Sequence, residues 1–203
     1  MSAAAPQVVR MLHELGGVSD EPGKLPRTFL SPAMRRANAL VGKWMRAAGL
    51  AVREDAMGNL IGRLETCRAA SPNPAVGGRA KAGGVRRPRP TKTLLLGSHL
   101  DTVRDAGRFD GPLGVLLPIA ALADLKRRGI ALPFAVEVLG FSEEEGVRFA
   151  SAYLGSKGFA GQLRAADLGW SDAAGVTVGE VLRKHHRGRF TRPKSAHRPG
   201  NLI

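Results

Sequence analysis

This sequence of 203 residues has almost no cysteine, no long apolar run and no leader-like start. A single cysteine, Cys67, excludes a disulfide framework and a cysteine-rich metal cluster. The longest apolar stretch, Leu113–Ala123, has about half the length that a membrane span needs. The first residues also lack the basic-then-apolar order of a secretory signal. Because 43% of the residues are hydrophobic, the chain can bury a core, and we expect a cytoplasmic protein without membrane association.

Acidic residues are missing from two segments, one between Thr66 and Lys92 and one from Arg183 to Ile203. These segments hold fourteen of the 31 basic residues, and the remaining seventeen equal the 17 acidic ones, so the formal net charge of +14 lies in the two segments alone. Both are rich in glycine, proline and arginine, and apart from Phe190 they lack aromatic side chains for stacking on bases. We therefore expect solvated, flexible peptide rather than a nucleic-acid interface.

What is present near the N-terminus predicts a helix and a hairpin. Residues 31–49 carry apolar side chains at helical spacing, with Ser31 as a cap, Pro32 in the first turn and Gly49 at the end. Residues 50–65, LAVREDAMGNLIGRLE, predict two short strands that turn near Gly58. The low-complexity stretch that follows predicts a surface insertion between strands.

A strand–helix–strand unit follows the insertion. Residues 93–98, TLLLGS, predict a strand, and residues 112–128 predict a helix that Pro118 kinks or delays. Residues 132–142, LPFAVEVLGFS, predict a second strand. This order is typical of an α/β protein with parallel strands, in which functional groups gather at the carboxyl ends of the strands. A short helix is expected over 151–159, and the periodic pattern is lost after about 181.

Side chains that can bind metal follow both strands. They lie on loops within 47 positions of one another, and they are His99, Asp101, Asp110, Glu143, Glu144 and Glu145. Imidazole nitrogen and carboxylate oxygen are ligands for hard or borderline divalent ions. His99 offers one ring nitrogen, and Asp101 can accept the proton of the other. Asp110 has two oxygens and can bridge two ions, while paired glutamates can supply one ligand and one general base.

Each of these residues also has an ordinary structural interpretation. A histidine after a strand is usually structural, Asp110 can cap the helix that follows it, and three consecutive glutamates usually form a solvated turn. Together the structural interpretations are weaker, because three separate loops at one sheet edge all carry ligand types. Like charges in that arrangement repel one another unless a cation is present.

Three motifs carry a resemblance to a known family. GSHLDTV, GRFDGPLGV and FSEEEGVRF resemble the M20 peptidase group of dinuclear metal amidohydrolases, in the branch with allantoate amidohydrolase and N-carbamoyl-L-amino-acid hydrolase. The resemblance covers about Val8 to Val181 without the insertion. It implies a three-layer zinc-exopeptidase-like α/β domain with a mixed, mainly parallel sheet, two zinc or manganese ions, and hydrolysis of a ureido or carbamoyl C–N bond in a small molecule.

The resemblance also implies residue roles. His99 would be a terminal metal ligand supported by Asp101, and Asp110 would bridge both ions before a cis peptide bond to Gly111. Glu143 would be the general base and Glu144 a ligand of the second ion, or the register would shift by one towards Glu145.

Parts of that family pattern are not found in this sequence. They are a histidine in a HIEQG-like strand, a histidine near the end of a chain about twice as long, and a lid and dimerisation domain. His185, His186 and His197 are possible substitutes in a basic tail from 183 to 203. We therefore expect residues 1–182 to be the N-terminal part of a catalytic domain, in a truncated and impaired hydrolase. The alternative is a non-enzymatic remnant whose basic segments bind nucleic acid or a partner.

Overall fold

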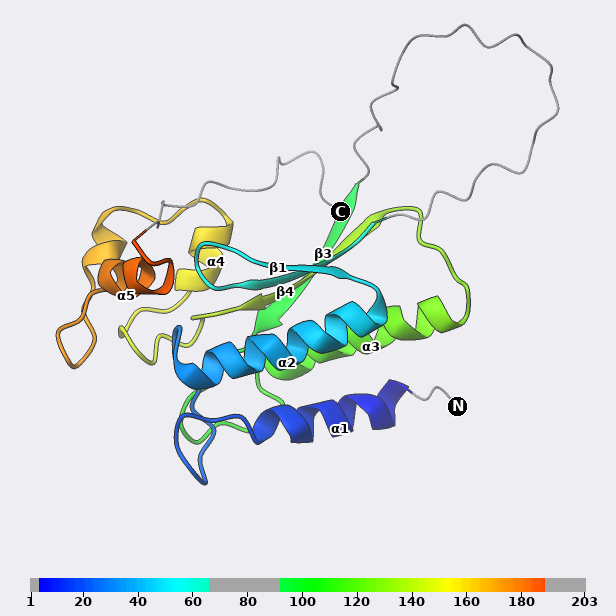
Figure 1. The fold of residues 1–203 in the computed structure, drawn as a ribbon, viewed down its shortest axis with the longest axis horizontal. Coiled ribbons are helices and arrows are strands. Elements are labelled where there is room, and N and C mark those ends of the chain that lie inside the picture. Colours follow the sequence, from blue (N-terminus) through cyan, green and yellow to red (C-terminus); the bar gives the residue numbers. More distant parts are fainter. Residues whose placement is uncertain (1–3, 66–91, 189–203) are drawn as a thin grey trace, which may run out of the picture.

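A computed structural model describes residues 4–65 and 92–188, which form a four-stranded sheet with helices beside it (Figure 1). The elements in chain order are α1 (Ala4–Gly16), α2 (Pro32–Ala48), β1 (Ala51–Glu54), β2 (Leu60–Leu64), β3 (Thr93–His99), α3 (Pro112–Arg127), β4 (Ala135–Phe141), α4 (Leu154–Phe159), a 3-10 helix (Ala166–Gly169) and α5 (Val178–His185). The expected insertion at 67–90 and most of the expected tail lie outside the described residues.

The strands lie in the order β1-β2-β4-β3. β3 and β4 are parallel neighbours joined through α3, as the sequence predicts, and His99 lies opposite Phe141 in their register. The pairings of β1 with β2 and of β2 with β4 are antiparallel. The α/β class and the mixed sheet are thus confirmed, but the expectation of a mainly parallel sheet is wrong for these strands, because the hairpin enters the sheet antiparallel to β4.

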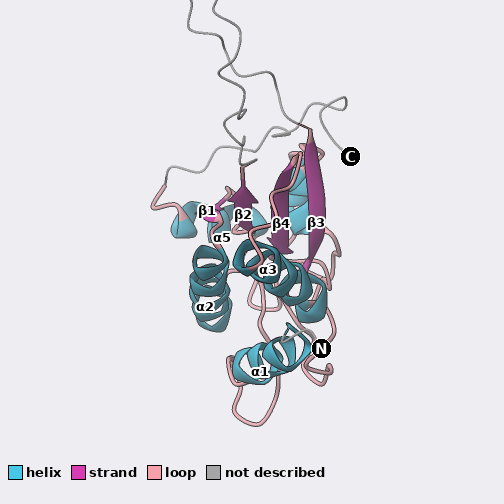
Figure 2. Cartoon of the chain, turned by 90° about the vertical axis from the view of Figure 1, so that its right-hand side faces the viewer, coloured by secondary structure: helices cyan, strands magenta, loops and turns pink. Residues whose placement is uncertain are grey.

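Helices α2 and α3 cover one face of the sheet, and α1 packs against α3 on the far side (Figure 2). Side chains from all three helices meet those of the sheet in the main core, which includes Leu12, Met45, Leu116 and Val138. Within the described residues no helix layer covers the opposite face, so the expected three-layer arrangement is seen there only in part. A second apolar cluster holds Phe29, Met57 and residues of α4 and α5 beside the end of β4.

The helix expected over residues 31–49 is confirmed together with its caps. Ser31 accepts a hydrogen bond from the backbone N–H of Met34, and Gly49 ends α2 at a φ of 98°. α3 runs through Pro118 from its start at Pro112, so the delayed start is not seen. None of the helices in the described residues is long and apolar enough to cross a membrane.

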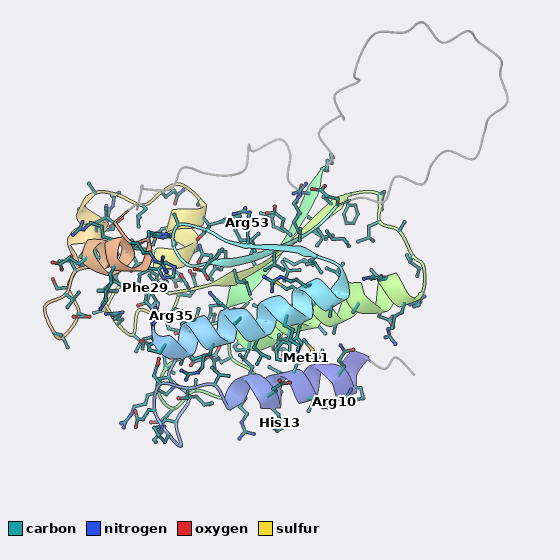
Figure 3. The ribbon with its side chains drawn as sticks, viewed as in Figure 1. Arg10, Met11, His13, Phe29, Arg35 and Arg53 are labelled. Atoms are coloured by element: carbon teal, nitrogen blue, oxygen red, sulfur yellow. The ribbon has the colours of Figure 1, made fainter. Side chains whose placement is uncertain are left out.

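Two helices, α1 and α5, were not expected from the sequence. In α1, Met11 faces the other helices whereas His13 points away from them (Figure 3). α5 reaches His185, and this corrects the boundary of the expected tail, because residues from 183 to 185 are helical. The start of α5 carries a capping box in which the side chains and backbones of Thr177 and Glu180 bond reciprocally.

Candidate active site

The parallel pairing of β3 and β4 brings two chain segments to the same edge of the sheet. His99 is the last residue of β3, and Phe141 opposite it is the last residue of β4. The loop after β4 begins with Ser142, whose backbone N–H donates to Asn59 Oδ1 at 3.0 Å and whose hydroxyl donates to the carbonyl of Met57 at 2.7 Å. The hairpin of β1 and β2 therefore fixes the path of the three glutamates that follow.

The ring of His99 is oriented by the backbone of Asp101. Its Nδ1 lies 2.9 Å from the carbonyl oxygen of Asp101, which can only accept a hydrogen bond, so Nδ1 carries the proton. The carboxylate of Asp101, which we expected to fix the tautomer, lies farther away, with Oδ1 at 3.6 Å from Nδ1. In the neutral ring Nε2 then has a free lone pair on the side facing away from Asp101.

That lone pair faces two carboxylates. Nε2 of His99 lies 3.8 Å from Oδ1 of Asp110 and 3.5 Å from Oε1 of Glu145. One ligand atom from each of these residues lies within 4.8 Å of the others. Ligands at about 2.1 Å from one ion in tetrahedral geometry lie about 3.4 Å apart. The donor set and its spacing therefore fit a divalent cation. The 3.8 Å between His99 Nε2 and Asp110 Oδ1 is close to the spacing of two ligands that share one ion.

Asp101 is buried behind His99 and holds the loop after β4. Its Oδ2 accepts the backbone N–H groups of Glu144 at 3.1 Å and Glu145 at 3.0 Å. Oδ1 is buried without a hydrogen-bond partner. Burial raises the pKa of this carboxyl above its ordinary value, against the backbone hydrogen bonds and His99, which lower it.

The three glutamates have three different environments. Glu143 is fully buried, and burial with the nearby charge of Asp101 raises its pKa to about 8. The carboxylate of Glu144 accepts the backbone N–H of Ser156 at 2.8 Å and its hydroxyl at 2.9 Å, and burial raises its pKa. Glu145 is the glutamate beside His99. In the described residues the group with His99 and Asp110 thus includes Glu145 and not Glu144.

Asp110 is brought to His99 by a tight turn at Gly111. Gly111 has a φ of 79°, and a Cβ there would lie 2.5 Å from ring atoms of His99 and 2.7 Å from its carbonyl oxygen. The described residues contain no cis peptide bond, so the cis bond expected between Asp110 and Gly111 is not present. Only glycine combines this positive φ with the close approach of the turn to the ring.

Sequence reasoning missed Asn59 and Ser156, which hold the glutamate loop. Asn59 also donates to the carbonyl of Gly155 at 2.9 Å, so it ties the loop to α4. An isolated asparagine or serine gives no pattern from which this contact could be found. Of the proposed substitute ligands, His185 lies 2.8 Å from Glu54 and His186 lies 2.8 Å from the carbonyl of Ala56, and neither is grouped with His99. His197 lies outside the described residues.

Comparison with known proteins identifies the wider group. Residues 95–189 match the model of peptidase family M20/M25/M40. The chain is 42% identical to an allantoate deiminase from Arabidopsis thaliana over 181 residues, which are 88% of this chain and 31% of that protein. It is 36% identical to an N-carbamoyl-L-amino acid amidohydrolase from Geobacillus stearothermophilus, over 94% of this chain and 42% of that protein. Residues 95–189 thus carry a match to the peptidase M20 domain.

A solved amidase structure has the same fold. The crystal structure of a hydantoinase/carbamoylase family amidase from Burkholderia ambifaria matches with a TM-score of 0.74 and 32% identity, over 95% of this chain and 42% of that chain. The chain thus spans between about a third and two fifths of the length of these relatives. The M20 match implies metal-dependent chemistry, which agrees with the grouped ligands near the ends of β3 and β4. Nothing in these comparisons supports the alternative of a nucleic-acid-binding remnant.

Proposed function

We propose that this chain is the metal-binding part of an amidohydrolase that cleaves a C–N bond, other than a peptide bond, in a ureido or carbamoyl compound. Allantoate and N-carbamoyl-L-amino acids are the candidate substrates, because the relatives at 42% and 36% identity carry those names. The observation that carries the proposal is the convergence of His99, Asp110 and Glu145 within 4.8 Å at the edge shared by β3 and β4. Zinc and manganese are the candidate ions, since both accept nitrogen and oxygen ligands.

His99 Nε2, Asp110 and Glu145 would hold the metal, with the second oxygen of Asp110 available to a second ion. A divalent ion supplies a Lewis acid for the substrate carbonyl and lowers the pKa of water. Glu144 is the candidate general base, because it lies next to Glu145 and is only partly buried, with its pKa raised above the ordinary value. A carboxyl in this position can take a proton from water and pass it to the leaving nitrogen. Glu143 is too deeply buried to reach a substrate.

The test is a titration of the 203-residue chain with Co²⁺, followed by visible absorption. We expect one saturable site and a spectral change when N-carbamoyl amino acid or allantoate is added, but no change with the matching free amino acid. His99→Ala should weaken Co²⁺ binding by at least 10- to 100-fold, because even the loss of a hydrogen-bond partner behind a metal ligand has an effect of that size. His13→Ala is the control, because His13 is an exposed histidine on α1. Equal Co²⁺ affinity in the two variants, or a spectrum that does not change when the carbamoyl compound is added, would contradict the proposal.

The register of the glutamates has its own test. Glu145→Gln should weaken metal binding by on the order of 10-fold or more, because it removes a ligand beside His99. Glu144→Gln should leave the affinity within about 3-fold and remove any hydrolysis of allantoate or N-carbamoyl amino acids, because it removes the base. We expect hydrolysis by this chain to be slow. A catalytic zinc normally has three protein ligands, whereas the three ligands grouped in the described residues would have to be shared if two ions bind. The reverse order of affinities would restore Glu144 as the ligand.

A further inference from the structure

Arg27 is a buried arginine between α1 and α2, and only 2% of its surface is exposed. Its Nε donates to the carbonyl oxygen of Leu100 at 2.9 Å, and its Nη1 donates to the carbonyls of Leu15 at 3.3 Å and Val18 at 3.2 Å. Among the described residues no carboxylate lies within ion-pair distance of it, and burial lowers its pKa to about 10, so it remains charged at neutral pH. A buried cation bound only to neutral carbonyls is costly, and an apolar side chain of similar volume would fill this place without that cost.

The carbonyl that accepts from Nε belongs to the residue between His99 and Asp101. The backbone of Arg27 also forms a bridge with Thr102 on the other side of Asp101. Its N–H donates to Thr102 Oγ1 at 3.2 Å, and its carbonyl accepts the N–H of Thr102 at 3.2 Å. Arg27 therefore holds the chain immediately before and immediately after Asp101.

Asp101 in turn sets the ring of His99 through its carbonyl oxygen. We infer that Arg27 is a positioning residue for the metal site: by holding the carbonyl of Leu100 and the backbone of Thr102, it fixes the peptide that orients the His99 ring and its tautomer. The inference deepens the proposed function and rests on it. Hydrogen-bond partners behind a metal ligand typically change metal affinity by 10- to 100-fold, and Arg27 lies one step farther back.

The test compares Arg27→Lys with wild type in the full 203-residue chain. Lysine keeps the charge and an aliphatic stem, but its three N–H donors lie on one nitrogen and cannot reproduce donors at the separate positions of Nε and Nη1. In EDTA at pH 8.5, well above the ordinary imidazole pKa of about 6.5, ¹⁵N NMR of the His99 ring reports the tautomer directly. We expect wild type to hold the proton on Nδ1, and the variant to populate the Nε2 tautomer and to bind Co²⁺ about 10-fold more weakly.

Arg63→Lys is the control, because Arg63 lies on β2 and binds Glu137 at 3.1 Å within the sheet. It should change neither the tautomer nor the metal affinity. A folded Arg27→Lys chain with an unchanged His99 tautomer overturns the inference. Absence of metal binding in wild type would refute the proposed function instead, since the tautomer measurement needs no metal.

Failure of the lysine variant to fold leaves a measurement on wild type. Hydrogen exchange of the Arg27 Nε proton should be slowed by the bond to Leu100 and its burial, and His99 should be a single Nδ1–H tautomer. Exchange as fast as that of a solvated arginine, or a mixture of His99 tautomers beside a protected Nε proton, overturns the inference.

Discussion

Replacing Gly111 by alanine is expected to weaken metal binding by on the order of 10- to 100-fold, as for other changes that misplace a metal ligand. The new Cβ would meet the His99 ring at 2.5 Å, closer than carbon atoms approach without displacement. The ring must then rotate away from Asp110 and from the carbonyl of Asp101. Alanine at a φ of 79° adds backbone strain, so we also expect a loss of about 2–4 kcal/mol in the free energy of unfolding from strain and overpacking together.

Gly107→Ala is the matched control for this substitution. Gly107 lies in the same loop, a Cβ there would meet nothing within 4 Å, and its φ is not in the left-handed region. Its effect on stability should stay within about 0.5 kcal/mol. Urea unfolding and Co²⁺ titration of both variants measure the two effects. A Gly111→Ala chain that binds Co²⁺ as tightly as Gly107→Ala would show that the turn at Asp110 does not place a metal ligand.

Local chemistry predicted α2 well, because every signal lies within the helix itself. Ser31, Pro32 and Gly49 mark its ends to within one residue. The same kind of signal marks α5, where Thr177 and Glu180 form a capping box, but the basic residues after it resemble a disordered tail. The basic composition therefore favours a disordered tail, whereas the cap marks the start of a helix. α1 also has apolar residues at helical spacing, among them Val8, Met11, Leu12 and Leu15, which are buried in the core.

Strand partners were harder to predict than strands. The short apolar stretch after the turn at Gly58 indicates that β2 is a strand, but not that Ile61 lies opposite Leu139 of β4. Pairing across more than 70 positions is decided by packing over α2 and α3, and no local pattern records it. The family resemblance implies a mainly parallel sheet, and no local signal in the hairpin sequence shows that it pairs antiparallel to β4.

In the candidate site, too, local sequence predicts some residues, whereas contacts with distant parts of the chain decide the others. His99 and Asp110 could be placed because the end of a strand and the start of a helix fix them within a few residues. The choice among Glu143, Glu144 and Glu145 could not be made from the sequence, because three identical side chains in a row carry no register. Contacts from elsewhere in the chain decide it: Asp101 binds the backbone of the last two glutamates, and Ser156 binds the side chain of Glu144.

Glu143→Gln is expected to flatten the dependence of stability on pH in the metal-free chain. The pKa of Glu143 is raised from an ordinary 4.5 to about 8 by burial and by Asp101. Between those two values the folded chain holds a proton that the unfolded chain has released. Folding therefore takes up a proton, and wild type loses stability as the pH rises from 5 to 8. At about 1.4 kcal/mol per pKa unit, the loss over that range from this one group is about 3 kcal/mol.

Glutamine cannot titrate, so its own effect on packing is the same at both pH values and cancels from the comparison. Urea unfolding in EDTA at pH 5 and pH 8 should show that the variant gains about 3 kcal/mol relative to wild type between the two. Glu14→Gln is the control, since Glu14 is exposed on α1, and its curve should run parallel to that of wild type. A parallel curve for Glu143→Gln would mean that Glu143 is ionised in the folded chain at neutral pH. It would then be a charged neighbour of the metal ligands rather than a neutral carboxylic acid buried behind them.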